Sequence, residues 1–278
     1  MNARSRAELQ TVLGKIVRTE PVAGGDINEA RRVELADRTL VFVKSHSAPP
    51  PGMYAAEAAG LAWLREGTLR VPRVIAVGDT FLALEWLELG QRDRHSEEKL
   101  GRGLAQLHAL GAPTFGLDRS NYLATIPQDN MPEADFATFY IERRLRPLIA
   151  QLRRIDVTDL DAGLDALARR PERFGPPERP ARLHGDLWWG NVAFCDRAPV
   201  LIDPAVYGGH REIDLAMLML FGGVSELLVG AYSEVWPLAP DWRSRVQLWQ
   251  LYPVAAHAVL FGGGYTRQLS RMLSELTS

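Results

Sequence analysis

The chain has 278 residues, of which 46% are hydrophobic and 24% charged, and its formal net charge is -2. This composition is typical of a globular protein with a sizeable core, in one large domain or two lobes. The near-neutral charge gives no electrostatic case for binding nucleic acid or an anionic membrane. A single cysteine, Cys195, excludes an internal disulfide framework and a cysteine-rich zinc site.

The N-terminal residues 1–6 lead into a polar helical pattern rather than the apolar segment of a targeting signal. No uninterrupted apolar run is long enough to span a bilayer, so we expect a cytoplasmic protein that does not bind membranes. The sequence leaves the oligomeric state open, with a monomer slightly favoured. Cys195 lies in an apolar hairpin, which favours a buried small side chain over a reactive thiol.

The first third of the chain predicts a short helix over 7–15 and strands over 17–22 and 31–35. Two adjacent glycines, Gly24 and Gly25, separate these strands. Adjacent glycines let a backbone approach phosphates closely, and kinase-like folds cover a nucleotide with such a turn. Taken alone, a Gly-Gly pair in a hairpin is more often only a turn.

An apolar strand over 39–44 follows and ends in Lys44, and the next helix, over 54–66, carries Glu57. Leu61 and Leu64 mark the buried face of that helix. Lysines that end strands are usually solvated. A strand lysine on the α- and β-phosphates, held by a glutamate on the following helix, is nevertheless the upper half of a kinase site, and we assign Lys44 and Glu57 to it.

A second hairpin is predicted from strands over 74–77 and 81–87. Backbone groups at its exit could pair with the edge of adenine. We therefore expect the nucleotide-binding lobe to occupy residues 1–90, with these residues at the hinge: Glu85, Trp86 and Leu87.

Beyond Gly90 the chain predicts helices over 97–110, 134–153 and 160–169, the second of them bent at Pro147, with an ordered loop at 115–128 between the first two. His108 is interpreted as a structural histidine. An arginine cluster is more typical of a partly solvated helical face than of an anion site. Its members are Arg143, Arg144 and Arg146.

The stretch 183–191 contains the first two candidate catalytic residues. Asp186 is followed five residues later by Asn191, and Asp203 closes a later apolar run. Phosphoryl transfer from ATP needs an acceptor for the proton of the attacking hydroxyl and oxygen ligands for Mg²⁺. We assign Asp186 to the first role and Asn191 and Asp203 to the second. Strands over 192–195 and 199–202 would form a hairpin that returns Asp203 to Asn191.

The C-terminal part predicts a helix from about residue 211, with Asp214 tying the catalytic loop in place, and helices over 242–251 and from 254 past a glycine run to 273. The fold class is therefore α+β. We expect a two-lobed, protein-kinase-like fold with a small antiparallel sheet in the N-lobe and a mainly helical C-lobe over residues 91–278.

The sequence resembles the fructosamine-3-kinase and ketosamine kinase family, a branch of the protein-kinase-like, aminoglycoside-phosphotransferase-like fold. The resemblance covers nearly the whole chain, and Asp203 is followed by Pro-Ala rather than the Phe-Gly of protein kinases. The motifs that carry it are His184–Trp188 with Gly190 and Asn191, Asp203–Ala205, Tyr207–Met217, Gly24–Asn28 and Leu260–Tyr265.

The resemblance implies phosphorylation of a sugar hydroxyl on a ketosamine, with ATP and Mg²⁺, where the ketosamine is a glycated amine of a small molecule or a protein side chain. It repeats the roles given above for Asp186, Asn191 and Asp203. It also implies that Trp188 stacks on the sugar, with simple packing under the loop as the alternative. Tyr207 and His210 are the remaining substrate residues that it implies.

Two positions depart from the family pattern and flank the expected substrate pocket: Trp189, where a small residue is expected, and Gly208, where a second aromatic is common. These departures leave the acceptor more open than the reaction. One alternative is a kinase of another hydroxylated amine, aminoglycoside or choline-like. Another is a nucleotide-binding regulatory pseudokinase, which the full set of candidate catalytic residues argues against.

Overall fold

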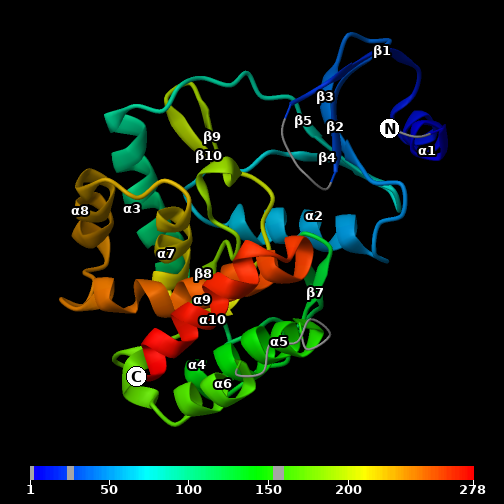
Figure 1. Ribbon diagram of the computed structural model, residues 1–278. Helices are drawn as coiled ribbons and strands as arrows, with labels where there is room; N and C mark the ends of the chain where they lie inside the picture. The colour runs from blue at the N-terminus through cyan, green and yellow to red at the C-terminus, as the bar shows by residue number, and fades with distance from the viewer. Residues whose placement is uncertain (1–2, 24–27, 153–159) are drawn as a thin grey trace.

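The computed structural model describes residues 3–23, 28–152 and 160–278. The upper part holds a five-stranded antiparallel sheet in the order β1-β2-β3-β5-β4 (Figure 1). Gly24 and Gly25, expected to cover the nucleotide, lie outside the described residues. The strands are β1 (Ile16–Pro21), β2 (Glu29–Leu35), β3 (Leu40–Ser45), β4 (Val74–Val77) and β5 (Phe81–Glu85).

Two helices accompany the sheet. The first, α1 (Ala3–Leu13), buries Leu9 in a small core with Val33, Val41 and Phe81. The second, α2 (Met53–Leu64), joins β3 to β4 and buries Leu61 and Leu64, as its apolar spacing predicts. The antiparallel sheet and α2 therefore confirm the N-terminal part of the predicted fold.

The lower part is mainly helical. It begins with α3 (Arg94–Leu110), whose N-terminus is closed by a capping box between Asp93 and Ser96 and whose C-terminus is followed by Gly111. The further helices are α4 (Phe136–Thr138), α5 (Arg146–Leu152), α6 (Leu160–Ala168), α7 (Glu212–Leu220), α8 (Glu226–Val235), α9 (Val246–Phe261) and α10 (Gly264–Thr277).

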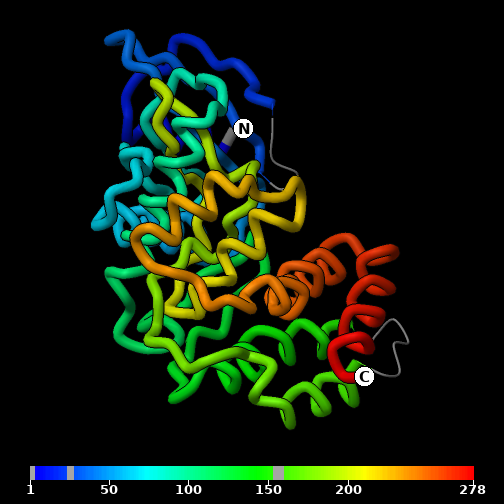
Figure 2. Tube along the Cα trace, turned by 90° about the vertical axis from the view of Figure 1, so that its left-hand side faces the viewer, coloured from blue at the N-terminus to red at the C-terminus, as the bar shows by residue number. Residues whose placement is uncertain are grey.

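Three short antiparallel pairs interrupt these helices: β6 (Asn121–Leu123) with β7 (Ile126–Gln128), β8 (Ala181–Leu183) with β11 (Tyr207–Gly209), and β9 (Val192–Cys195) with β10 (Ala198–Leu201). The last pair extends from the helical part toward the sheet in both views (Figures 1 and 2). There Leu201 N donates to Arg70 O at 2.9 Å and Gly90 N donates to Phe194 O at 2.7 Å. The two parts are thus connected by backbone hydrogen bonds as well as by the chain.

The helix predicted over 134–153 is not a regular bent helix. Residues Phe139–Leu145 form a π-helix between α4 and α5, so the irregularity precedes Pro147 by a turn. Proline has no N–H to donate to the carbonyl of Arg143. That carbonyl instead accepts from the guanidinium of Arg144 at 3.3 Å.

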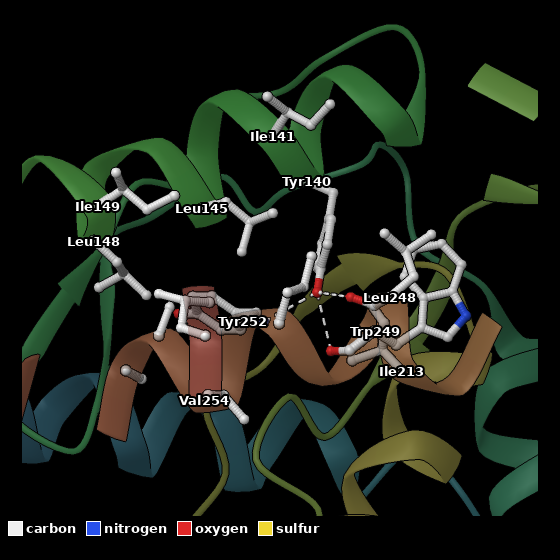
Figure 3. Packing of buried hydrophobic residues seen from close by; sticks show 14 of the residues in the cluster. Tyr140, Ile141, Leu145, Leu148, Ile149, Ile213, Leu248, Trp249, Tyr252 and Val254 are labelled. Atoms are coloured by element: carbon white, nitrogen blue, oxygen red, sulfur yellow. Dashed lines mark hydrogen bonds between the residues drawn. The ribbon is translucent and has the colours of Figure 1, made fainter. Parts of the chain in front are cut away.

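The break predicted near residue 252 is wrong, because α9 continues through Pro253. A proline there leaves the carbonyl of Trp249 without its usual helical donor. The Tyr140 hydroxyl replaces that donor: it lies 2.9 Å from Trp249 O and 2.8 Å from Leu248 O, and it accepts from Tyr252 N at 3.1 Å (Figure 3). A side chain from the π-helix therefore completes the backbone hydrogen bonding of α9.

The helix α8 is not among the elements expected from the sequence. Ser225 caps its N-terminus, with its hydroxyl accepting from Leu228 N at 3.1 Å. The helix packs on α3 at Gly101, where an added Cβ would lie 2.3 Å from Leu228 O. The absence of a side chain at Gly101 lets the two backbones approach closely.

Candidate functional site

Lys44 lies on β3 and forms two ion pairs. Its Nζ is 2.7 Å from Glu57 Oε1 on α2 and 2.8 Å from Asp203 Oδ1. Lys44 is buried, and burial alone would lower its pKa; the carboxylates of Asp203 and Glu57 outweigh that effect and raise the pKa of Lys44. The ammonium is therefore held charged between the sheet and the lower part.

The position of α2 is fixed from the lower part as well as from the sheet. Gly60 approaches so closely that an added Cβ would lie 3.3 Å from Pro204 Cγ and 3.5 Å from Val206 Cγ2. Just before the helix, Pro51 O accepts from the hydroxyl of Tyr122 at 2.8 Å. Glu57 is thereby held facing Lys44.

Asp186 lies in the loop after β8 and is bonded to Asn191. The amide Nδ2 of Asn191 donates to Asp186 Oδ2 at 3.0 Å and to Asp186 O at 2.8 Å. Desolvation, followed by the charge of Asp203, raises the pKa of the Asp186 carboxyl to about 7. A carboxyl whose pKa lies near neutrality can accept a proton in one step and release it in the next.

The loop that carries Asp186 is anchored from below by Asp214, a fully buried residue on α7. Asp214 Oδ2 accepts from His184 N at 2.7 Å and Oδ1 accepts from Gly185 N at 3.0 Å. Burial alone would raise the pKa of Asp214, but its hydrogen bond to His108 and nearby charges outweigh that and lower it. The structural role predicted for Asp214 is confirmed.

His108 is also structural, as expected. Its Nε2 donates to Asp214 Oδ2 at 3.2 Å, and its Nδ1 accepts from the Tyr232 hydroxyl at 2.8 Å.

Gly185 adds a steric constraint on the loop that carries Asp186. Its φ is 83°, and an added Cβ would lie 2.1 Å from Ala205 O. Only glycine fits this position, and the backbone of the loop is therefore defined from two sides.

The hairpin of β9 and β10 brings the remaining polar groups together. Its turn residues, Asp196 and Arg197, have φ of 50° and 60°, the conformation of a two-residue type I′ turn. At its base, Ile202 N donates to Asn191 O at 3.1 Å, so Asp203 follows directly beside Asn191. The hairpin predicted from the sequence is confirmed, and Cys195 within it is buried.

A small pocket, with room for about one water molecule, lies beside Asp186. Aromatic and apolar side chains of α7 and α9 form most of its wall, and the Trp249 indole is held by a hydrogen bond from its Nε1 to Glu212 Oε2 at 2.9 Å. The lining residues are Leu123, Gly185, Asp186, Ile213, Met217, Trp249, Tyr252 and Pro253. Sequence reasoning missed the α9 residues, because aromatic side chains in an apolar helix more often belong to the core.

The three side chains expected at the sugar lie at different depths. Trp188 is 39% exposed, two residues beyond Asp186. Tyr207 is buried beneath the guanidinium of Arg144, 4.1 Å above its ring. His210 is buried and stacks on Trp249 at 4.9 Å. Tyr207 and His210 thus lie behind the described pocket wall, where they can affect a substrate only through the residues in front of them.

The two positions that depart from the family pattern do not line this pocket. Gly208 exchanges backbone hydrogen bonds with Gly116 at 2.7 and 2.9 Å, and an added Cβ would lie 2.1 Å from Thr114 O. An aromatic side chain cannot fit there. Trp189 donates from Nε1 to Gly223 O at 2.8 Å, and the Arg92 guanidinium lies 3.7 Å from its ring centroid. Neither residue lines the pocket at Asp186, and the expectation that they flank the bound acceptor stays a prediction.

The arginine cluster is structural, although not as a solvated face throughout. Arg143 is paired with Asp129 and Glu133, and Arg146 with Glu142 and Asp165. Arg144 differs from the expectation. It is 1% exposed, because its guanidinium packs against Tyr207 and donates to Asn130 Oδ1 at 2.6 Å.

The expected hinge follows β5. Glu85 N donates to Arg73 O at 2.9 Å, and Trp86 Nε1 donates to Glu88 Oε1 at 2.7 Å. The Arg32 guanidinium lies 5.4 Å from the Trp86 ring centroid. Contact of Glu85, Trp86 and Leu87 with adenine stays a prediction.

The chain matches a family model described as fructosamine kinase over residues 1–278. It is 37% identical to a protein named probable ketoamine kinase from Enterococcus faecium, with 96% of this chain and 99% of that protein covered.

Solved structures agree with this match. The crystal structure of a "putative fructosamine-3-kinase" from Thermobifida fusca is 37% identical, with a TM-score of 0.88 and 97% of each chain covered. An aminoglycoside phosphotransferase in a ternary complex with ADP and hygromycin B is 12% identical, with a TM-score of 0.66 and 98% of this chain and 97% of that chain covered. This second likeness shows the shared protein-kinase-like fold alone.

Proposed function

The chain belongs to the fructosamine kinase family, an ATP-dependent kinase family that phosphorylates ketosamines, and we propose that Asp186, Asn191, Asp203 and Lys44 carry its reaction. The observation that supports this most is the ion pairing of Lys44 with both Glu57 and Asp203, at 2.7 and 2.8 Å. These residues come from β3, α2 and the end of the β9–β10 hairpin. Their meeting is the arrangement that ATP-dependent phosphoryl transfer uses.

Asp186 is proposed as the base. In the pocket it is placed to accept the proton of the attacking sugar hydroxyl, while the bond from Asn191 holds one of its oxygens in orientation. Lys44 would contact the α- and β-phosphates. Asp203 would then no longer pair with Lys44, and Glu57 would keep the ammonium in place. Trp188, exposed next to Asp186, is proposed to stack on the sugar.

Mg²⁺ is proposed as the metal because Asn191 and Asp203 have hard oxygen donors and the base of the β9–β10 hairpin brings their backbones together. The partly exposed Asp203 carboxylate leaves room for waters and phosphate oxygens. When bound, the ion would neutralise negative charge on the transferring phosphoryl group. Asn191 and Asp203 are the residues that would hold it.

We further propose that residues 1–90 act as the nucleotide-binding unit and residues 91–278 as the acceptor-binding unit. A monomer acting in the cytoplasm, on a free or protein-bound ketosamine, is the simplest form of this proposal. Among the described residues no helix has the length and apolar character needed to cross a membrane. Nothing in the charge of the chain supports a nucleic-acid partner.

The experiment that tests the acceptor is a phosphoryl-transfer screen of the purified protein across ketosamines, aminoglycosides, a choline-like amino alcohol and free sugars, with ATP and Mg²⁺. Turnover of a fructosamine or ribulosamine is expected. Turnover confined to an aminoglycoside or choline-like compound would contradict the proposal in favour of another hydroxylated amine. ATP binding without transfer to any acceptor would favour a regulatory pseudokinase.

A further inference from the structure

A strip of aromatic rings begins at Trp188 and runs away from the pocket. We call it the aromatic strip, and its members contact one another in sequence at centroid distances of 6.1 Å for Trp188 with Phe221, 5.3 Å for Phe221 with His257, and 5.0 Å for His257 with Tyr265. Phe261 closes the strip, 5.6 Å from His257. None of these contacts is used by the phosphoryl-transfer residues described above.

The strip continues the wall of the pocket. Met217 of α7 and Pro253 of α9 line the pocket at Asp186. His257 lies four residues beyond Pro253 on the same face of α9, and Phe221 is the first residue after the end of α7, four residues beyond Met217. A molecule with its reacting hydroxyl at Asp186 would therefore meet Phe221 and His257 where it leaves the pocket.

Several of these rings are unusually open to solvent. Trp188 is 39% exposed, Phe221 42% and Phe261 53%. Contiguous exposed aromatic side chains at the mouth of a pocket are typical of a ligand-binding surface rather than of packing.

His257 adds a polar group to this apolar surface. Its Nδ1 lies 2.7 Å from Pro253 O, and because a carbonyl can only accept, Nδ1 is the donor. In the neutral ring this leaves Nε2 as an acceptor, and no described residue forms a hydrogen bond with it. The strip thus combines aromatic faces, which attract cations, with an acceptor for an N–H group.

We propose that the part of the aromatic strip beyond Trp188 binds the amino end of the acceptor, that is, the ammonium nitrogen of the ketosamine and the carbon substituent attached to it. This inference rests on the proposed function, because it takes the acceptor to be a ketosamine with its sugar hydroxyl at Asp186. The nitrogen of such a compound is a basic amine on the carbon next to the ketose carbon, and its substituent is the part of the acceptor that extends beyond the sugar. Aromatic faces stabilise such a cation and pack against an apolar substituent.

The proposal predicts selectivity for the amine. Ketosamines made from benzylamine should be better acceptors than those made from methylamine, and ketosamines made from glycine should be worse, because the glycine carboxylate offsets the ammonium charge beside the aromatic faces. The test compares kcat/KM for these three ketosamines, and for an N-acetylated derivative without the positive charge, at saturating ATP.

The informative variants are Phe261→Ala, Phe261→Leu and His257→Ala, with Val17→Ala on β1 as the control, since Val17 is 61% exposed and lies on the sheet. Phe261→Ala should lower the benzylamine-to-methylamine ratio by about three- to tenfold, the size of one aromatic contact with a cation or an apolar group. Phe261→Leu should restore part of the apolar preference without the preference for the charged amine. KM for ATP should not change in any of them.

Each outcome is decisive. A ratio that stays constant across the variants, with ketosamine turnover intact, would overturn the inference and leave the proposed function standing. An equal loss of kcat/KM for all acceptors would also overturn it, because a general defect shows no selectivity for the amine. Absence of turnover of every ketosamine by the unmodified protein would contradict both, and the screen described above would already have revealed it.

Discussion

Lys44 has two partners in this structure, and the proposed function requires only one of them when a nucleotide is bound. Asp203 lies 2.8 Å from the ammonium and is partly exposed, whereas Glu57 lies 2.7 Å away and is nearly buried. The Asp203 carboxylate is open to solvent on one side, so it is the partner that bound phosphates could reach and replace. We expect the buried pair with Glu57 to persist and to position the lysine.

Asp186→Ala is expected to keep nucleotide binding but to lose at least about 10²-fold in kcat, the usual size of a general-base effect. Asp186→Asn should lose a similar factor, because an amide cannot accept the proton. Steady-state kinetics and nucleotide titration measure the two quantities. Asp118→Ala, on an exposed loop, is the control. Unchanged turnover in Asp186→Ala would remove Asp186 from the mechanism.

At the residue scale the sequence was sufficient for the polar centre. The order Lys44, Glu57, Asp186, Asn191, Asp203 corresponds to a set of residues that the fold brings together. The residues that form the pocket wall could not be predicted from the sequence. Trp249 and Tyr252 lie in an apolar helix, where hydrophobic pattern alone cannot distinguish a side chain that lines a pocket from one that fills the core.

At the scale of single elements, α9 shows how a helix tolerates an internal proline. Pro253 leaves Trp249 O without a helical donor, and the Tyr140 hydroxyl takes that place from the π-helix across the core (Figure 3). Because Trp249 and Tyr252 both line the pocket at Asp186, this contact also holds part of the wall of that pocket in place. Tyr140 and Pro253 therefore form a coupled pair.

Tyr140→Phe should lower the free energy of unfolding by about 1–3 kcal/mol, because it leaves a buried carbonyl without a donor. In a Pro253→Ala background the loss should be smaller, since an alanine at this position would supply a backbone N–H to the same carbonyl. Urea denaturation of the four proteins gives the coupling energy, with about 0.5 kcal/mol or more expected. An identical loss in both backgrounds would contradict this account of α9.

The helices that were wrongly predicted from the sequence depend on features that the local sequence does not show. The break near Pro253 is predicted from the residue type. No residue near Pro253 in the sequence indicates that Tyr140, far away in the chain, compensates for the missing donor. The π-helix before Pro147 likewise has no sequence signature of its own. For α8 a signal did exist: Ser225 followed by Glu226 is a typical helix start.

At the scale of the whole molecule, the buried histidines link stability to pH. Burial lowers the pKa of His210 below its usual value of 6.5. The charges of Glu212 and Glu178 oppose this shift, and those of Arg245 and Arg211 add to it. The unfolded chain therefore binds a proton that the folded chain does not. The stability associated with His210 is complete above about pH 6.5 and is lost as the pH falls below it.

His210→Gln should reduce the slope of unfolding free energy against pH between about pH 6.5 and pH 5, by at most about 1.4 kcal/mol per pH unit. The comparison is between slopes, so a constant loss of stability in the variant does not affect it. His95→Gln, at an exposed position on α3, is the matched control. An unchanged slope in His210→Gln would show that this histidine does not contribute to acid sensitivity.

The general architecture followed from the order of the motifs, whereas the way in which the two parts are joined did not. In the β9–β10 hairpin, Leu201 N donates to Arg70 O, and Phe194 O accepts from Gly90 N. These are backbone contacts between segments more than a hundred residues apart, and side-chain patterns carry no information about them. The family resemblance could supply the fold but not these hydrogen bonds.

The packing of α2 has a consequence for control of the enzyme. Many protein kinases are switched off by moving the corresponding helix outward, which separates the lysine from the glutamate. Here Gly60 lies so close to Pro204 and Val206 that an added Cβ would touch both, and Pro51 O accepts from the Tyr122 hydroxyl, so such a movement would separate α2 from the lower part. We expect the Lys44–Glu57 pair to be permanently assembled.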